Sequence, residues 1–221
     1  MNVFVAGASR GIGLEFLRQY RAAGDRVVAT ARSDEALEAL RGLGAHAVAL
    51  DVTSAESASR LAWQIDGIAF DVVVYCAGVY GPRHSGLQTP TQAEFDAVMH
   101  TNVLGAMRVI PQLADSLVPG ARVAVLSSRM GAIGPRGSPA GWLYRASKAA
   151  LNSVLKDMSL ALNGRAICVA FHPGWVRTDM GGAGADVPPQ QSVADMRKLL
   201  TRVEPVDNGT FLNHDGSPIP W

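Results

Sequence analysis

The sequence has only two cysteines among its 221 residues and almost no excess charge of either sign. Cys76 and Cys168 lie inside apolar runs, which favours reduced core residues over a disulfide or a metal pair. The chain has 20 basic and 19 acidic residues, a net charge of +1 and no dense block of lysine and arginine. These numbers give no indication of binding to nucleic acid or to an anionic membrane, so we expect small-molecule partners.

Long hydrophobic runs and export signals are also missing. No stretch approaches the ~20 apolar residues that a membrane helix needs, and the first residues lack the cationic and apolar segments of a signal peptide. We therefore expect a cytoplasmic protein with no membrane anchor. The five histidines have no spacing typical of metal ligands, so no metal site is predicted.

Short apolar runs alternate with helical patterns along the chain. The runs predict strands at 2–6, 26–30, 45–50, 71–76, 122–126 and 166–171. Strands that alternate with helices form right-handed βαβ crossovers. The sequence therefore predicts an α/β fold: one dinucleotide-binding domain over residues 1–221, with a single Rossmann-type, doubly wound parallel sheet flanked by helices on both faces. Residues 181–189 are rich in glycine and proline, and we interpret the region around 180–200 as a substrate lid.

The first predicted strand is followed by a turn rich in glycine and then by a helical pattern. Glycines let the backbone approach a pyrophosphate closely, and the free N–H groups at the start of a helix favour that anion. A tight turn with no ligand is the alternative, but the position at the head of an α/β chain favours a dinucleotide site. The candidate residues of this glycine loop are Gly7, Ser9, Arg10, Gly11, Ile12 and Gly13.

Tyr144 and Lys148 are four residues apart in a helical pattern, so their side chains project from one face. An adjacent ammonium group favours the phenolate and lowers the pKa of the phenol, which would make proton transfer to a carbonyl oxygen practicable. A surface lysine beside a half-buried tyrosine is the alternative interpretation, because the spacing also occurs by chance.

The end of the second predicted strand indicates which dinucleotide binds. A carboxylate at this position usually accepts hydrogen bonds from the adenosine ribose and repels a 2′-phosphate. Here the strand end has no acid; Ala31 is followed by Arg32, and Arg10 lies in the glycine loop. Each arginine alone could be a solvated surface group, but two guanidinium groups and a missing acid favour NADP(H) over NAD(H).

Further motifs follow in an order that resembles the short-chain dehydrogenase/reductase family, from about residue 2 to the carboxyl end. The motifs are Gly7 to Gly13, Leu50-Asp51-Val52-Thr53, Cys76-Ala77-Gly78, Asn102, Ser127-Ser128-x-x-Gly131, Tyr144-x-x-x-Lys148 and Pro173-Gly174 through Thr178. Within the family, residues 172–182 and 215–221 resemble the C-factor and sniffer-type carbonyl reductases.

The chain departs from this family at three points. Ala6 and Cys76 stand where threonine and asparagine are usual, so the hydrogen bonds of those side chains must be absent or replaced. Ser128 and Tyr144 are sixteen residues apart, a longer spacing than many members have. The segment Gly134–Pro139 can absorb the excess as a loop.

The resemblance implies a reaction in which hydride passes between NADP(H) and a ketone or aldehyde. It implies that Tyr144 is the general acid/base, that Ser128 steadies the substrate oxygen, and that Lys148 and Asn102 complete a proton relay. Ser127 is the alternative to Ser128, and an interior polar group is the alternative role of Asn102. Enoyl reduction is disfavoured, since that branch of the family spaces its tyrosine and lysine more widely. Beyond the glycine loop, the implied cofactor-binding residues are Arg32, Asp51, Val52, Ala77, Gly78, Asn102, Tyr144, Lys148, Pro173, Gly174, Val176 and Thr178.

Two further expectations concern turnover and assembly. A non-catalytic NADP(H)-binding regulator or signalling protein is the competing hypothesis, because a fold does not determine a function. The intact set of four implied catalytic residues argues against it. The family also implies a homodimer, with a tetramer possible. An apolar face of Leu151, Val154, Leu155 and Met158 on the helix of Tyr144 could form the interface.

Overall fold

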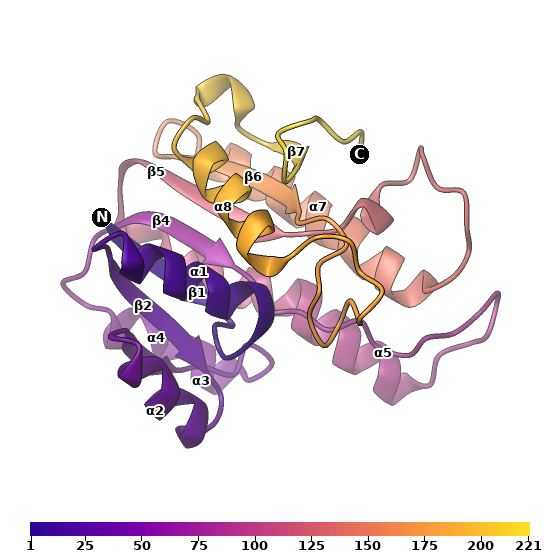
Figure 1. The fold of residues 1–221 in the computed structure, drawn as a ribbon, viewed down its shortest axis with the longest axis horizontal. Helices are drawn as coiled ribbons and strands as arrows, with labels where there is room; N and C mark the ends of the chain where they lie inside the picture. Colours follow the sequence, from indigo (N-terminus) through magenta and orange to yellow (C-terminus); the bar gives the residue numbers. More distant parts are fainter.

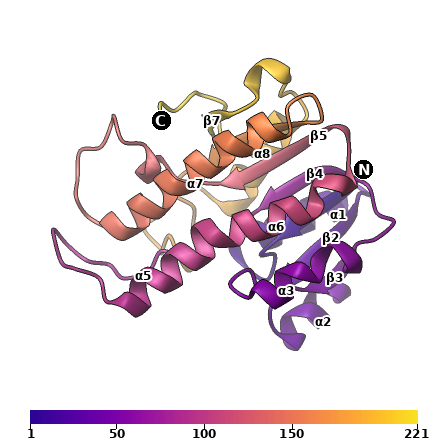
Figure 2. The same ribbon diagram turned by 180° about the vertical axis from the view of Figure 1, so that it is seen from behind.

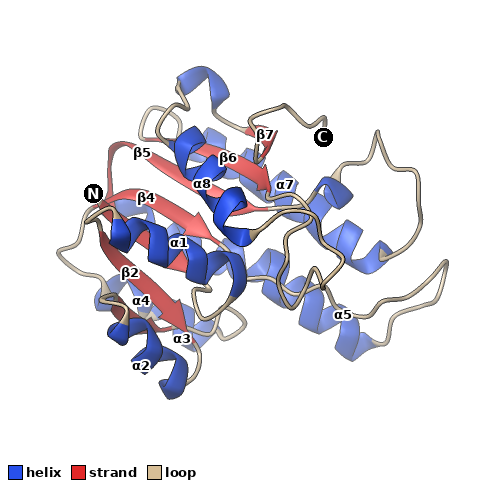
Figure 3. Ribbon diagram, viewed as in Figure 1, coloured by secondary structure: helices blue, strands red, loops and turns tan.

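A computed structural model describes residues 1–221, with a central sheet between two layers of helices (Figure 1). All neighbouring strands are parallel, and their order is β3-β2-β1-β4-β5-β6-β7 (Figure 3). The predicted doubly wound parallel sheet is confirmed. The direction of winding reverses between β1 and β4, so a crevice forms where these strands end. The strands are β1 (Asn2–Ala6), β2 (Arg26–Ala31), β3 (His46–Ala49), β4 (Phe70–Tyr75), β5 (Leu117–Leu126), β6 (Ala166–His172) and β7 (Thr210–Asn213).

The helices cover both faces of the sheet. Buried side chains of α1, α2 and α8 pack on one face, and those of α3, α4, α6 and α7 pack on the other. Figure 2 shows the ribbon from the side of α6 and α7. None of the helices combines the length and the apolar character that a membrane span requires. The α-helices are α1 (Gly11–Ala22), α2 (Asp34–Gly42), α3 (Ala55–Ser59), α4 (Leu61–Gln64), α5 (Gln92–Met99), α6 (Gly105–Leu113), α7 (Trp142–Ala161) and α8 (Pro189–Leu200). Short helical turns lie at η1 (His100–Leu104, a π-helix), η2 (Ala114–Ser116), η3 (Arg129–Gly131) and η4 (Pro205–Asp207).

The core consists of two apolar layers, one on each side of the sheet. In β1, Val3 and Val5 face one layer while Phe4 and Ala6 face the other, and none of the four is exposed. Phe4 packs edge to face on Phe70, with ring centroids 5.5 Å apart. Because helices cover both faces, the strands are apolar on both sides, which explains why they are continuous apolar runs in the sequence.

The structure has more strand than the sequence predicts. The β7 strand was not predicted because it has only four residues at the edge of the sheet, and only Phe211 among them is fully buried. The β5 strand begins at Leu117 rather than at Arg122, because its first residues are half-buried or exposed and have no strong apolar pattern.

The region predicted as a lid contains two kinds of structure. Residues 178–188 form turns and bends, whereas Pro189 begins the regular helix α8. Val193 and Met196 of α8 are fully buried in the layer that also contains residues of α1. A mobile lid can therefore extend only over the segment before Pro189, since α8 is part of the core.

The apolar face predicted for a dimer contact is partly wrong. Leu151 and Leu155 are fully buried within the single chain, because α7 turns these positions, one helical turn apart, toward the sheet. Val154 and Met158 are half-buried. The homodimer stays a prediction, with a smaller apolar surface on α7 than the sequence indicated.

Candidate active site

A cleft lies at the carboxyl ends of the central strands, where the winding of the sheet reverses. It encloses about 1220 Å³ of empty space, including its open mouth. Four of the predicted site residues, Asn102, Ser128, Gly174 and Val176, are not part of its wall. The predicted residues that line it are Gly7, Ser9, Arg10, Gly11, Ile12, Gly13, Arg32, Asp51, Val52, Ala77, Gly78, Tyr144, Lys148, Pro173 and Thr178.

The glycine loop is shaped by contacts that leave no room for side chains. A Cβ atom on Gly13 would lie 2.2 Å from the carbonyl oxygen of Gly7, and one on Gly7 would lie 2.9 Å from the backbone of Ala77. Helix α1 begins at Gly11 and has neither a side-chain cap nor an acidic residue in its first turn. Its first backbone N–H groups therefore remain available to an anion, as binding of a pyrophosphate requires.

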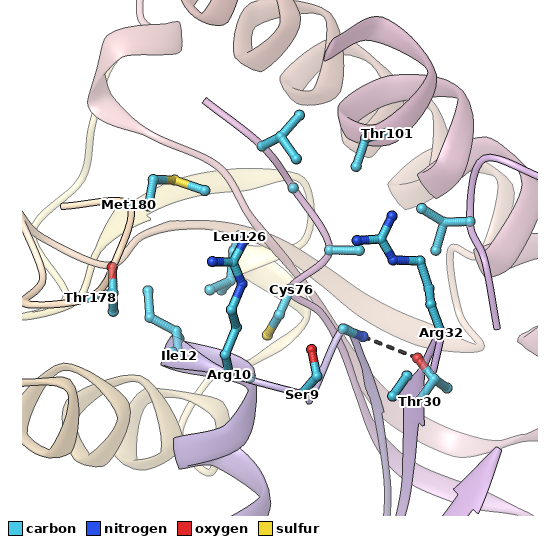
Figure 4. A pocket seen from close by; sticks show the side chains of 18 of the residues that line it. Ser9, Arg10, Ile12, Thr30, Arg32, Cys76, Thr101, Leu126, Thr178 and Met180 are labelled. Atoms are coloured by element: carbon cyan, nitrogen blue, oxygen red, sulfur yellow. Dashed lines mark hydrogen bonds between the residues drawn. The ribbon is translucent and has the colours of Figure 1, made fainter. Parts of the chain in front are cut away.

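Thr30 of β2 holds the glycine loop in place, a role that no local sequence pattern indicates. The backbone N–H of Gly7 donates to the Thr30 hydroxyl at 3.1 Å (Figure 4). The N–H of Ala8 donates to the Thr30 carbonyl at 2.9 Å. This hydroxyl comes from the neighbouring strand and braces the end of β1, where Ala6 provides no polar side chain. Only the pairing of β1 with β2 brings Thr30 to this position.

Two arginines lie around the cleft. Figure 4 shows the side chains of Arg10 and Arg32, which come from the glycine loop and from the end of β2. Arg10 forms an exposed ion pair with Asp179, with 3.1 Å between Nη1 and Oδ2. Arg32 is exposed and forms no ion pair. The two guanidinium groups give this end of the cleft a positive charge suited to a phosphate.

Asp51 is engaged within its own turn. Its Oδ1 atom accepts hydrogen bonds from the backbone N–H of Thr53 at 2.9 Å and from the Thr53 hydroxyl at 2.7 Å. Partial burial acts to raise the pKa of Asp51, but these bonds and the nearby Arg32 cation outweigh it and hold the pKa below its usual value. The carboxylate therefore stabilises the loop after β3, while Val52 forms part of the cleft wall.

Tyr144 lies at the cleft wall and is only 8% exposed. Burial raises its pKa to about 12, against a smaller lowering effect from a hydrogen bond with the Ser128 side chain. The predicted lowering of this pKa by Lys148 is wrong for this structure. The ammonium nitrogen lies 5.7 Å from the centroid of the tyrosine ring, and the loss of water around the phenol dominates.

The two serines after β5 have different partners. Ser127 donates from its Oγ to Oδ1 of the buried Asn152, which ties the strand end to α7. Ser128 accepts a hydrogen bond from the N–H of Met130 at 3.2 Å and reaches the side chain of Tyr144. Ser127 lines the cleft and Ser128 interacts with the side chain of Tyr144, so the choice of Ser128 stays a prediction.

Lys148 is buried near the ring of Tyr144. Its Nζ atom donates to the carbonyl oxygen of Leu126 at 2.8 Å, and burial lowers its pKa to about 8. A Cβ atom on Gly78 would lie 3.5 Å from this Nζ and 3.3 Å from Oδ1 of Asn102. The bare glycine therefore lets the lysine and the asparagine approach the end of β4 together.

Asn102 is fully buried in the π-helix η1 and clamps the segment that follows β4. Its Oδ1 accepts from the N–H of Val79 at 2.8 Å, and its Nδ2 donates to the Val79 carbonyl at 2.9 Å. The same Nδ2 donates to the Ser147 hydroxyl of α7 at 2.9 Å. Both amide hydrogens are thus used within the protein, so the side chain acts on the architecture of the site. A π-helical turn is frequent at functional sites.

The segment after β6 is held by a hydrogen bond from α8. Ser192 of α8 donates to the carbonyl oxygen of Pro173 at 2.6 Å, and Gly174 adopts a positive φ of 85°. Val176 is buried and forms a bridge with Val187. Pro173 and Thr178 face the cleft, whereas Gly174 and Val176 determine the path of the segment between them.

Residues 1–186 match the sequence profile of short chain dehydrogenases. The chain belongs to the short-chain dehydrogenase/reductase family. The confirmed family makes it an oxidoreductase, and the cleft occupies the position at which a doubly wound fold binds a dinucleotide.

Three proteins illustrate the similarity of other chains to this one over most or all of its length. C-signal of Myxococcus xanthus is 36% identical over 154 residues, which cover 68% of this chain and 92% of that protein. A short-chain dehydrogenase/reductase from Burkholderia multivorans, solved with bound NADP, has a TM-score of 0.89 and 29% identity and covers 100% of this chain and 99% of its own. The carbonyl reductase Sniffer of D. melanogaster has a TM-score of 0.88 and 27% identity, with the same coverage.

This short-chain dehydrogenase/reductase carries Cys76 at the end of β4, where its side chain lines the cleft. The backbone N–H of Cys76 donates to the Ala6 carbonyl at 2.9 Å. Burial raises the pKa of the thiol well above its usual value, so the group is a neutral thiol rather than a nucleophilic thiolate. The bracing expected from an asparagine here is supplied by the main chain and by Asn102.

Proposed function

We propose that this short-chain dehydrogenase/reductase reduces a ketone or an aldehyde to an alcohol with NADPH, and catalyses the reverse reaction under oxidising conditions. The observation that carries the proposal is the grouping of Tyr144 and Lys148 in the wall of the cleft, with Ser128, outside the wall, beside the side chain of Tyr144. The similarity to a carbonyl reductase and to a family member with bound NADP supports the same reaction and the same cofactor.

The residues of the cleft divide the chemistry among themselves. When bound, the reduced nicotinamide supplies the hydride for the carbonyl carbon. Tyr144 gives the proton of its Oη to the carbonyl oxygen, because a phenol with a pKa of about 12 is protonated at neutral pH. Ser128 donates a hydrogen bond to the same oxygen and orients it. Lys148, whose pKa is about 8, holds a proton close to neutrality and can return one to the phenol.

The preference for NADP(H) follows from the charges at the other end of the cleft. Arg32 is exposed and has no ion-pair partner, which makes it the first candidate for the 2′-phosphate. Arg10 is the second candidate, and it would have to share its charge with Asp179 or leave it. No carboxylate at the end of β2 repels the phosphate, since Ala31 occupies that place.

A second candidate function is that of a signalling protein that binds NADP(H) without turnover. The relative named C-signal favours it. The buried lysine and the tyrosine–serine pair argue for turnover instead, because a binding module has no use for a proton donor. The two candidates therefore differ in a single measurable property, the consumption of NADPH.

The test is NADPH oxidation by the purified protein with a panel of aldehydes, ketones and diketones, alongside NADPH binding measured by fluorescence. Turnover of at least one carbonyl class, faster with NADPH than with NADH, is the expected result. Tight binding of NADPH with no oxidation across the whole panel would favour the signalling protein.

A further inference from the structure

Tyr80 lies face to face with Tyr144. The two ring centroids are 4.6 Å apart, and the ring planes differ by 23°. Tyr80 comes from the irregular segment after β4, two residues beyond Gly78, and its side chain is half-buried. It belongs to neither apolar layer of the core. Its ring therefore covers the ring of Tyr144 rather than filling the apolar core.

Contacts with the start of α7 fix the position of Tyr80. Gly141, at the amino end of α7, has a φ of +70°, and a Cβ atom there would lie 2.6 Å from the Tyr80 hydroxyl oxygen. The N–H of Gly141 also donates to the carbonyl of His84 at 3.2 Å. The indole N–H of Trp142 donates to the carbonyl of Gln88 at 3.0 Å. The segment of Tyr80 is thus fastened to the helix that carries Tyr144.

Arg83 connects the segment of Tyr80 to Met180, which is far along the chain. Its guanidinium carbon lies 5.0 Å from the centroid of the Tyr80 ring, which is within cation–π distance. Its Nη2 atom donates to the carbonyl oxygen of Met180 at 3.0 Å, and Met180 lines the cleft. Tyr80 is therefore connected to both segments that border the reactive end of the cleft.

We propose that Tyr80 is a positioning residue for Tyr144, whose ring it holds by stacking so that the hydroxyl remains beside Ser128 and water stays away from the phenol. The inference rests on the proposed carbonyl reduction. Proton transfer requires a donor within hydrogen-bond reach of the substrate oxygen, and a misplacement of about 1 Å can cost about 100-fold in rate. A stacked ring restricts such movement without touching the hydroxyl.

The burial of Tyr144 agrees with this role. Burial is the main cause that raises the pKa of Tyr144, and Tyr80 also contributes to the rise. Removal of the Tyr80 ring should admit water to the phenol and lower its pKa toward the usual value. Carbonyl reduction needs the protonated phenol, so the alkaline limb that Tyr144 sets, a second and steeper fall in rate above the one set by Lys148, should then move to lower pH. A residue that only packs would change stability and leave this limb in place.

The test compares Tyr80→Leu, Tyr80→Phe and the control Leu87→Ala in the NADPH-bound enzyme. Leu87 lies on the same segment and is 81% exposed. We expect Tyr80→Leu to lower kcat about tenfold or more, with KM for NADPH within about twofold of the wild type, and to shift the alkaline limb to lower pH. Tyr80→Phe keeps the stacked ring and should restore both properties, and Leu87→Ala should resemble the wild type.

The outcomes separate this inference from the proposed function. A wild-type enzyme that reduces no carbonyl compound overturns both. An active wild type with an unchanged kcat and pH profile in Tyr80→Leu overturns the positioning role alone. If Tyr80→Leu does not fold, the variant Arg83→Met tests the positioning role instead, because Arg83 is exposed. It should lower kcat and shift the alkaline limb in the same direction, and an unchanged profile counts against the inference.

Discussion

The ammonium nitrogen of Lys148 donates a hydrogen bond of 2.8 Å to the carbonyl oxygen of Leu126, the last residue of β5. The lysine is only 4% exposed, and no carboxylate forms an ion pair with it. The fall of its pKa from 10.5 to about 8 records the cost of this burial. With about 1.36 kcal/mol for each pKa unit, the charged lysine destabilises the folded state by about 3 kcal/mol at neutral pH.

Lys148→Met should therefore stabilise the protein while it abolishes reduction. The variant removes the buried charge but leaves the Leu126 carbonyl without its donor, which costs about 1–3 kcal/mol. The net gain should be on the order of 1 kcal/mol, or a Tm about 2–4 °C higher at pH 7. Thermal unfolding as a function of pH provides the check. The unfolded lysine binds its proton more tightly than the folded one, so the gain should shrink between pH 8 and 10.5. A variant with a lower Tm at every pH would contradict the argument.

Tyr144→Phe should abolish reduction with little change in the affinity for NADPH. The substitution removes only the hydroxyl that gives its proton to the substrate, and such groups contribute about 10²–10⁴-fold in rate. Steady-state kinetics and NADPH titration measure the two properties. Tyr20→Phe is a matched control, because Tyr20 is also buried but packs on Arg197 away from the cleft. A Tyr144→Phe enzyme that keeps more than about a tenth of the wild-type kcat would sink the assignment.

The two directions of the reaction should depend on pH in opposite ways. Reduction needs a protonated Tyr144, whose pKa is about 12, and a Lys148 that can supply a proton, whose pKa is about 8. Its rate should hold through neutral pH and decline in the alkaline range. Alcohol oxidation needs an acceptor for the proton, so its rate should rise over the same range. Initial rates in both directions from pH 6 to 10 test this, and a reduction rate that rises with pH would be inconsistent with Tyr144 as the acid.

Much of the fold could be predicted from the sequence because its strands are buried on both faces. Asn2–Ala6 is apolar without interruption, and glycines follow at once, so both the strand and the turn have local signals. The edge strand β7 has no such signal. The predicted lid extends into the helix α8, because the first residues of that helix follow a stretch rich in glycine and proline and have no local signal of their burial.

The candidate site divides in the same way. Tyr144 and Lys148 are recognisable because both lie on one helix at a fixed spacing. Tyr80 and Thr30 are not, since each acts through a contact with a distant part of the chain. The stacking of Tyr80 depends on how the segment after β4 folds over α7, and the bond from Gly7 to Thr30 depends on how β1 pairs with β2. Sequence spacing carries neither piece of information.

The preference for NADPH should be reversible at the end of β2. Ala31 lines the cleft and is followed by the exposed Arg32, so Ala31→Asp with Arg32→Ala adds a repulsive carboxylate and removes an attractive cation. A charge-assisted hydrogen bond is worth about 1.5–3 kcal/mol, and 1.4 kcal/mol corresponds to about tenfold in binding. The value of kcat/KM for NADPH should therefore fall at least about tenfold. NADH should gain, because the new carboxylate can accept its ribose hydroxyls.

Measurement of kcat/KM with both cofactors in the double variant and in each single variant checks this switch. Arg60→Ala is the matched control, since Arg60 is exposed and pairs with Glu56 away from the cleft. Thermal unfolding confirms that the carboxylate at position 31 leaves the fold intact. If the double variant folds and keeps the ratio of NADPH to NADH unchanged, the 2′-phosphate is held elsewhere. Arg10 is then the remaining candidate, because it is the other arginine of the cleft and needs only to release Asp179.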